Sequence, residues 1–159
     1  QQVPRLNGDE LLQSMEGAYA MIVNGYEAEI ISKKTGKSID ALCDELEILV
    51  ITHGGKGSTI YHQGEQISIP VFPPKEIKDP TGGGDAYRAG LIRGIAAGWP
   101  LKLAGQCGAL CATYALEHVG TQNHRFTIEE FVARFRTQFD DEGLLSSLLE
   151  MDSVTTAQR

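Results

Sequence analysis

The amino-acid sequence predicts an α/β domain in which a mostly parallel sheet is flanked by helices and carries an antiparallel hairpin. A continuous aliphatic run at 48–52 is typical of a strand covered on both faces, as in a parallel sheet. Two apolar arms at 58–62 and 66–72 flank a turn sequence at 63–65 and predict the hairpin. Segments with helical spacing alternate with these strands, which is the pattern of α/β proteins.

Caps and breakers set the limits of the elements in the first half of the chain. Asn7, with Glu10 three residues later, predicts a capped helix start. Ser38 is a second candidate cap, and Gly36 ends the helix before it. The predicted elements are a helix over 7–15, a strand over 18–23, a helix over 27–34 and a helix over 38–46.

Two helices rich in small residues are predicted in the second half. The first opens at Gly84 or Asp85, and the second is opened by Pro100 and closed by Gly120. Their small residues recur at i, i+4 spacing and form a ridge on each helix. Such ridges predict close helix packing, or else a helix held against the sheet or a flat ligand. The ridge residues are Ala86, Gly90, Gly94 and Gly98 on the first helix and Ala104, Gly108, Cys111, Ala112 and Ala115 on the second.

A last helix begins at a capping box that runs from Thr127 to Glu130, and it buries Phe131, Phe135 and Phe139 on one face. The chain has 159 residues, of which 42% are hydrophobic, enough for one compact domain. We therefore expect a single domain over 1–152, followed by a disordered tail at 153–159.

Net charge and cysteine content indicate which partners and which cellular compartment to expect. The net charge is −7 and the sequence pI is about 5.0, with no basic run, so a nucleic-acid or anionic-membrane partner is not expected. The three cysteines, Cys43, Cys107 and Cys111, lack metal-binding spacing. They suit a reducing compartment, and no signal peptide or membrane span is recognised, so we expect a cytoplasmic protein.

Residues 79–85, read Asp-Pro-Thr-Gly-Gly-Gly-Asp, carry the strongest chemical signal. Glycines that run into a helix start point unpaired N–H groups and the positive end of the helix dipole at one place, which predicts a phosphate site. Asp85 is either an acid that stabilises the first helical turn or a base that deprotonates an attacking hydroxyl. A Walker A loop is excluded because Gly57 follows Lys56, and a dinucleotide fingerprint because Tyr87 replaces its third glycine.

The stretch 79–90 resembles the second signature of the ribokinase-like, PfkB-type sugar and nucleoside kinases, Asp-x-Thr-Gly-Ala-Gly-Asp followed by an aromatic and a small residue. Two weaker matches occur in the right order. Residues 24–27 resemble the family's Asn-x-x-Glu, and residues 52–57 resemble its Thr-x-Gly-x-x-Gly nucleotide loop. Residues 88–90 and 120–122 further resemble the bacterial adenosine-kinase-like branch.

The resemblance implies a Rossmann-like ribokinase fold, of which this chain is similar to the C-terminal, ATP-binding half. The N-terminal half of the family supplies the start of the sheet, the lid and most of the sugar pocket. By the same resemblance, Asp85 is the catalytic base, and the N–H groups of Gly82, Gly83 and Gly84 form an anion hole for the transferring γ-phosphoryl group. Gly83 stands where the family commonly has alanine, and it still offers its N–H.

Further roles follow from the weaker matches. Thr52, Gly54 and Gly57 resemble residues that face the nucleotide, although an ordinary strand-to-hairpin turn is the alternative. Asn24 and Glu27 are similar to a pair that organises Mg²⁺ through water, and a helix cap with an acid in the first turn is the alternative.

Asp79 and Thr81 resemble positions that support a monovalent cation such as K⁺, or they shape the turn. The activity implied is transfer of the γ-phosphoryl group of ATP to a hydroxyl of a ribosyl compound, foremost a nucleoside such as adenosine. Two alternatives stay open: a kinase of a free or phosphorylated sugar, and a nucleotide-binding module that does no chemistry without the N-terminal half. The implied partners are ATP and a small sugar or nucleoside, and a homodimer is one option for the assembly.

Overall fold

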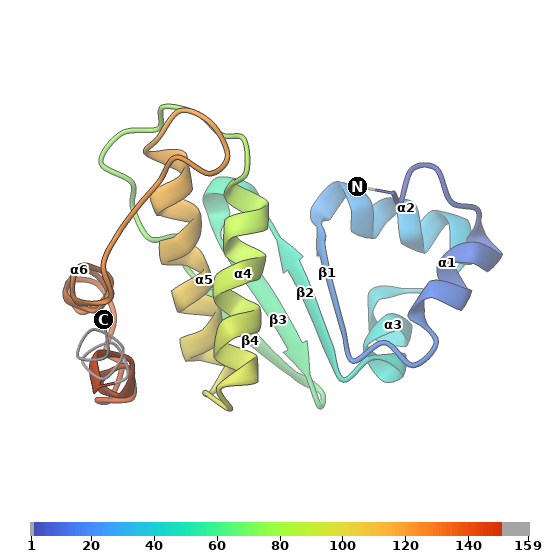
Figure 1. Ribbon diagram of the computed structural model, residues 1–159. Helices are drawn as coiled ribbons and strands as arrows, with labels where there is room; N and C mark the ends of the chain where they lie inside the picture. The colour runs from blue at the N-terminus through green and yellow to red at the C-terminus, as the bar shows by residue number, and fades with distance from the viewer. Residues whose placement is uncertain (1, 151–159) are drawn as a thin grey trace, which may run out of the picture. The chain divides into compact units, whose positions relative to one another are not determined.

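The computed structural model describes residues 2–150 and separates into two compact units, with the boundary between Val71 and Phe72 (Figure 1). The predicted extent of one domain over 1–152 stays a prediction, and the predicted tail at 153–159 lies outside the described residues. The first unit contains α1 (Gly8–Met15), β1 (Ala20–Asn24), α2 (Gly25–Thr35), α3 (Ile39–Glu45), β2 (Ile48–Thr52), a 3₁₀ turn (Gly54–Lys56), β3 (Ser58–His62) and β4 (Glu65–Ile69). The second unit contains α4 (Gly83–Ala96), α5 (Leu101–Leu116) and α6 (Ile128–Phe135).

The sheet of the first unit is mixed, with the strand order β1-β2-β3-β4. β1 and β2 are parallel, whereas β2–β3 and β3–β4 are antiparallel. The α/β class and the hairpin are confirmed, but the described sheet is not mostly parallel. A parallel neighbour needs a crossover of roughly a dozen residues or more, and only the short turn at 53–57 separates β2 from β3. β4 ends at Ile69, short of the predicted 72, because Pro70 has no N–H for the ladder.

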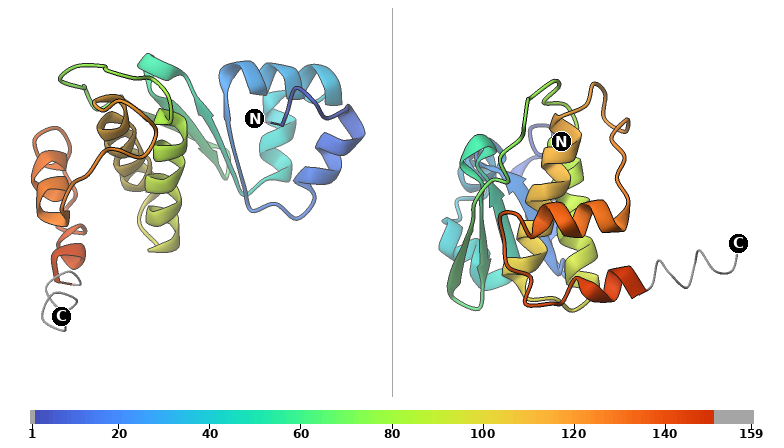
Figure 2. Two further views of the ribbon diagram at one scale, coloured as in Figure 1. Left: turned by 45° about the horizontal axis from the view of Figure 1, so that its top comes forward. Right: turned by 90° about the vertical axis from the view of Figure 1, so that its left-hand side faces the viewer.

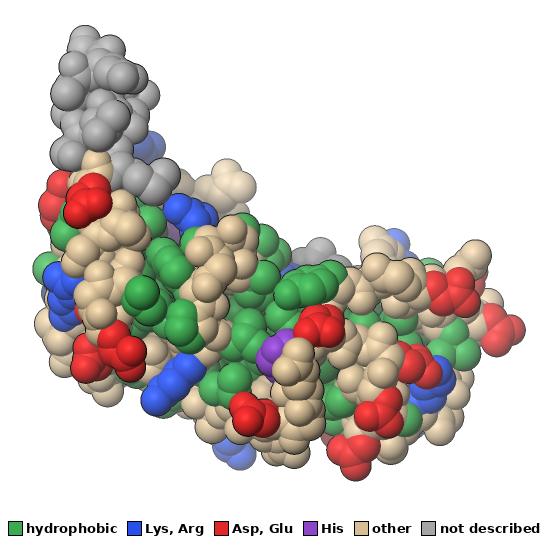
Figure 3. Space-filling view, turned by 90° about the horizontal axis from the view of Figure 1, so that it is seen from below, with side chains coloured by type: hydrophobic (Ala, Val, Ile, Leu, Met, Phe, Trp, Pro, Cys, Tyr) green, Lys and Arg blue, Asp and Glu red, His purple; other side chains and the backbone are tan. Residues whose placement is uncertain are grey.

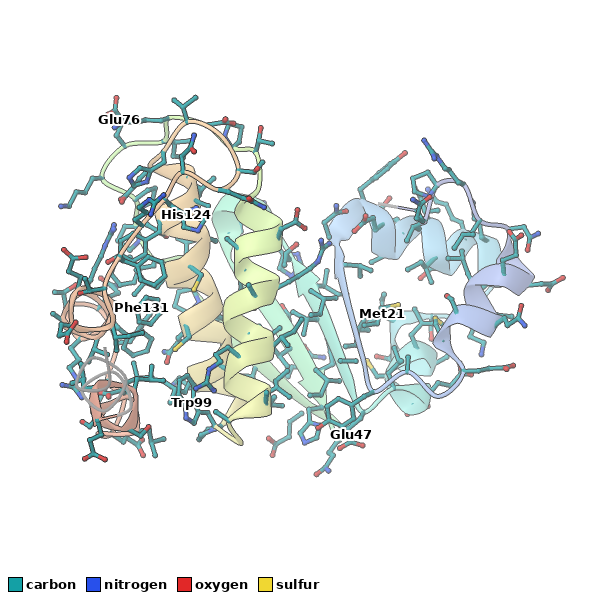
Figure 4. All side chains as sticks on the ribbon, viewed as in Figure 1. Met21, Glu47, Glu76, Trp99, His124 and Phe131 are labelled. Atoms are coloured by element: carbon teal, nitrogen blue, oxygen red, sulfur yellow. The ribbon has the colours of Figure 1, made fainter. Side chains whose placement is uncertain are left out.

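The predicted caps of the first unit are confirmed. Asn7 and Asn24 each accept the N–H of a glutamate three residues later, and that glutamate accepts the asparagine N–H in return. Ser38 caps α3, and Gly36 ends α2 with a φ of 72°. Met21 of β1 packs against a core between the helices and the sheet (Figure 4). That core consists of Leu11, Met15, Val23, Ala28, Ile31, Leu42, Leu46, Leu49 and Ile51.

In the second unit, α4 and α5 run antiparallel side by side, joined by a turn that holds Trp99 (Figures 1, 2 and 4). A Cβ atom at Gly90 would lie 2.8 Å from the Cys111 sulfur, and one at Gly94 would lie 2.6 Å from the Ala104 Cβ. Only hydrogen fits at these positions, so these small residues serve the close packing of the two helices, as predicted. The prediction is wrong for Gly98, which lies beyond the end of α4 with a φ of 71° and no atom of the described residues within 4 Å of a Cβ placed there.

α6 begins at the predicted capping box, in which Thr127 accepts an N–H at the third helical residue. Phe131 and Phe135 are buried, and the Phe131 ring stacks near Tyr114 of α5 (Figure 4). Phe139 lies beyond the end of α6 and is only half-buried, yet its ring centroid is 5.3 Å from that of Phe135. The aromatic side chains therefore hold α6 against α5.

The end of α5 differs from the prediction, because the helix stops at Leu116 and not near Gly120. The Leu116 carbonyl accepts the N–H groups of Lys78 and Asp79, at 2.8 and 3.3 Å. The Gly120 N–H, which would continue the helix, donates instead to the Asp79 carboxylate. Long-range hydrogen bonds thus replace the last helical turn.

Candidate active site

The glycine-rich loop leads directly into α4 and sets free amides at the helix start. Gly82 is the N-cap residue with a φ of 85°, and α4 begins at Gly83, one residue earlier than predicted, because Gly82 alone takes the left-handed conformation. The Ala86 N–H is the first to bond a helical carbonyl, that of Gly82, at 2.9 Å. The N–H groups of Gly83, Gly84 and Asp85 precede it and have no helical acceptor, and no side chain caps α4.

One carboxylate fixes this loop. Asp79 Oδ1 accepts the Thr81 N–H at 2.8 Å, and Asp79 Oδ2 accepts the Gly120 N–H at 2.9 Å. Hydrogen bonds from the Thr81 hydroxyl and then from the Gly120 N–H hold the pKa of the Asp79 carboxyl below its usual range. These contacts give Asp79 and Thr81 the turn-shaping role, and their role toward K⁺ stays a prediction.

The three loop glycines differ in whether backbone conformation or packing within the protein requires a glycine. Gly82 needs its positive φ, and a Cβ there would lie 3.1 Å from Thr121. A Cβ at Gly83 would lie 3.1 Å from the Leu116 side chain. Gly84 has helical backbone, and a Cβ there would meet no other atom within 4 Å. Neither strain nor packing among the described residues therefore requires glycine at position 84.

Asp85 stands in the first turn of α4 and points to solvent, with 66% of its side chain exposed. Its Oδ1 accepts a hydrogen bond from the Arg88 guanidinium at 2.7 Å. Arg88 was not predicted as a partner of Asp85. The i, i+3 spacing of opposite charges on a predicted helix was the signal that could have found it.

A second set of candidate residues lies at the carboxyl ends of the two parallel strands of the first unit. Asn24 ends β1 and Thr52 ends β2, and the two are register partners. Ligands of open α/β sheets bind at such strand ends. Asn24 Oδ1 accepts the Glu27 N–H at 2.8 Å, and Glu27 Oε2 accepts the Asn24 N–H at 3.0 Å. The pair therefore forms a helix cap, with Glu27 buried, and its role toward Mg²⁺ stays a prediction.

The loop after β2 is shaped by its glycines. Gly54 and Gly57 have positive φ values of 58° and 91°. The Gly57 carbonyl accepts the His53 N–H at 2.8 Å, and a Cβ at Gly57 would overlap the Ile69 carbonyl oxygen. A strand-to-hairpin turn accounts for both glycines, and the nucleotide contacts of Thr52, Gly54 and Gly57 stay a prediction.

Within residues 2–150, no three His, Cys, Asp or Glu side chains gather to hold a metal. None of the helices in that range is long and apolar enough to cross a bilayer. Acidic side chains spread over the face seen in Figure 3, and lysine and arginine side chains lie scattered among them.

The chain is similar to nucleoside kinases. It is 33% identical to a nucleoside kinase of Methanocaldococcus jannaschii over 134 residues, which is 84% of this chain and 44% of that protein. The structure matches the nucleoside kinase of Burkholderia thailandensis in complex with inosine at a TM-score of 0.85 and 38% identity, covering 87% of this chain and 47% of that one. It also matches the crystal structure of the M. jannaschii nucleoside kinase, an archaeal member of the ribokinase family, at a TM-score of 0.82 and 32% identity, over 86% of this chain and 46% of that one.

The chain spans less than half the length of each of these relatives. These matches confirm the ribokinase-like resemblance and the ribokinase fold. The model of the pfkB family carbohydrate kinases matches residues 2–127, a stretch that contains every candidate site residue. The chain therefore belongs to the pfkB family of carbohydrate kinases.

Proposed function

We propose that the complete protein transfers the γ-phosphoryl group of ATP to a hydroxyl of a ribosyl compound. The observation that carries this proposal is the start of α4, where the free amides of Gly83 and Gly84 adjoin the exposed Asp85 carboxylate. Gly84 adds support. Neither its backbone nor its packing requires glycine, whereas a phosphoryl group that approaches the backbone closely would require it. Membership of the pfkB family supports the same reaction class.

The chemistry assigned to this chain's residues is positioning, charge stabilisation and proton transfer. The acceptor hydroxyl oxygen bonds to the γ-phosphorus as the bond to the ADP oxygen breaks, and its proton passes to the Asp85 carboxylate. The N–H groups of Gly82, Gly83 and Gly84 donate to the phosphoryl oxygens, where negative charge is spread in the loose transition state. Preorganised amides act without reorganising during the reaction.

Asn24 and Glu27 would hold Mg²⁺ through water. The fit rests on their chemistry, since Mg²⁺ keeps several waters and needs one or two carboxylates besides the substrate phosphates. Glu27 supplies one carboxylate at the carboxyl end of the parallel strands. When bound, the ion would neutralise charge on the phosphates. Thr52, Gly54 and Gly57 would face the nucleotide at the neighbouring strand end.

The acceptor we propose is a nucleoside, with adenosine and inosine as the first candidates. The match to a nucleoside kinase in complex with inosine supports this choice over a free sugar. A K⁺ ion near Asp79 is a further candidate ligand, secondary to the turn that Asp79 holds. Three free thiols suit a cytoplasmic location.

The test is turnover by the complete protein with ATP, Mg²⁺ and a panel of adenosine, inosine, ribose and ribose 5-phosphate. We expect a nucleoside to be the best acceptor. Asp85→Asn should lower kcat by about 10²–10⁴-fold, because the base is lost, while calorimetry shows that ATP binding is not weakened. Near-normal turnover of Asp85→Asn would remove Asp85 from this role.

A second candidate function is a nucleotide-binding module without chemistry of its own. The observation that favours it is the length of the chain, which spans less than half of its relatives. If ATP raises the thermal midpoint of the protein while no acceptor in the panel is phosphorylated, the module is the correct description.

A further inference from the structure

The Asp85–Arg88 ion pair lies where the proposed function requires a phosphate to bind. Arg88 donates to Asp85 Oδ1 at 2.7 Å, and the two side chains are 34% and 66% exposed. Among residues 2–150, Arg88 has no other hydrogen-bond or ion-pair partner. Long helical side chains point back toward the helix N-terminus, so this arginine carries its charge from the second turn to the mouth of α4.

Helix stability does not account for this arrangement. Exposed ion pairs three residues apart contribute little to stability. Asp85 is already favoured in the first turn, because the helix dipole attracts negative charge there. A positive charge drawn to the same place opposes the dipole, so Arg88 works against the helix on its own.

Electrostatics explains why the two charges occur together at the helix start. The start of a helix carries a positive charge of roughly half a unit, and one carboxylate more than cancels it. With Asp85 alone, the free amides would stand in a net negative field that repels a phosphate. Arg88 returns the unit charge that Asp85 removes, so the helix start stays attractive to an anion while the base remains beside it.

We propose that Arg88 is a positioning residue that offsets the charge of Asp85 and orients its carboxylate, which allows the amides of α4 to bind the polyphosphate of ATP. The inference rests on the proposed function and adds a residue to that same site. It assigns Arg88 no direct contact with the phosphate. Its effect on binding is therefore opposite in sign to that of the carboxylate.

The test is a double-mutant cycle in the complete protein, with calorimetry of ATP and of tripolyphosphate as the nucleoside-free probe. Arg88→Gln should weaken binding of both by about tenfold, as expected for one unbalanced charge near the site. Asp85→Asn should strengthen binding of tripolyphosphate, and the double variant, in which both charges are gone, should bind about as well as the wild type, whose two charges cancel. Arg88→Lys keeps the charge and should restore most of the affinity, together with the KM for ATP.

Arg93→Gln is the matched control, since it makes the same charge change on α4 at an exposed arginine that stacks over Trp99. It should leave binding unchanged, and circular dichroism should show every variant folded. A double variant that binds much more weakly than the wild type would mean direct contact of Arg88 with phosphate, and no loss in Arg88→Gln alone would mean an incidental pair. Either result overturns this proposal and leaves the proposed function standing. A wild-type protein that binds neither ATP nor tripolyphosphate overturns the proposed function and this inference together.

Discussion

Single residues in the glycine loop have separate reasons to be glycine. Gly82 is fixed by its left-handed backbone, whereas Gly83 and Gly84 both have helical backbone and differ in what surrounds them. A methyl group at position 83 would meet Leu116 of the same unit, and one at position 84 would meet nothing. Two identical substitutions at neighbouring positions therefore separate protein packing from ligand binding.

Gly84→Ala should stabilise the ligand-free protein and weaken ATP binding. Alanine restricts the unfolded chain at a position whose backbone it can adopt, which raises the free energy of unfolding by about 0.4–1 kcal/mol. The added methyl group would crowd a phosphoryl group held against the amides. Urea denaturation and calorimetry with ATP measure the two effects. Gly83→Ala is the control, because its methyl group points at Leu116, and unchanged ATP affinity in Gly84→Ala would contradict the proposed site.

At the scale of elements, a partly buried ion pair joins α6 to Glu117, the residue that caps the end of α5. Arg134 of α6 donates two hydrogen bonds to Glu117, at 2.8 and 2.6 Å, and its guanidinium lies over the rings of Phe72 and Tyr114. Glu117 also accepts the Lys75 N–H at 2.8 Å. Only 17% of the Arg134 side chain and 12% of the Glu117 side chain are exposed. The cluster thus holds two helices and the segment that leads to the glycine loop.

Removing Arg134 should destabilise the protein and change how its stability depends on pH. Hydrogen bonds from Arg134 hold the pKa of Glu117 below its usual value, so this carboxylate stabilises the fold at neutral pH, and the contribution is lost as pH falls through the folded pKa. Arg134→Gln should cost on the order of 3 kcal/mol at neutral pH, because it leaves a partly buried charge without its partner.

Urea denaturation between pH 7 and about pH 3 measures this effect, and the variant should lose less stability than the wild type on acidification. Arg125→Gln, at an exposed arginine of the loop before α6, is the control and should follow the wild type. Parallel curves for the wild type and Arg134→Gln would show that Glu117 is not the carboxylate that responds to Arg134.

At the scale of the whole molecule, the sheet has an open side. Within residues 2–150, β1 is an edge strand that pairs only with β2. It carries no charged residue, and Met21 and Ile22 are only half-buried. Unpaired backbone groups on an apolar edge strand attract other strands. The 159-residue chain should therefore associate with itself more readily than its net charge of −7 suggests.

Ile22→Lys should reduce this association, because a lysine on an edge strand opposes pairing with another strand. Sedimentation velocity of the 159-residue chain over a range of concentrations measures the effect. Ile92→Lys makes the same change at a position of α4 that is already 54% exposed, and it should leave the association unchanged. Equal behaviour of the two variants would place the contact elsewhere.

Features that depend on neighbouring residues could be predicted from the sequence. The limits of β2 and the helix caps at Asn7, Ser38 and Thr127 depend on residues within a few positions of one another, and they were predicted correctly. The strand pairing that makes the sheet mixed and the bond from Gly120 to Asp79 join distant positions, which periodicity does not report. The same holds for the candidate site. The row of amides was predicted from consecutive residues, whereas the hydrogen bond from Arg88 to Asp85 depends on side-chain orientation, which the sequence pattern does not determine.

The close contact of α4 with α5 contains a cysteine whose reactivity can report when the two helices separate. Burial raises the pKa of Cys107 to about 12 and that of Cys111 to about 11, and Cys111 faces Gly90 across the helix pair. Alkylating reagents attack thiolates, so the Cys111 thiol should react slowly while the two helices stay packed. The rate of Cys111 alkylation at neutral pH would therefore report how often the two helices that present the glycine loop separate.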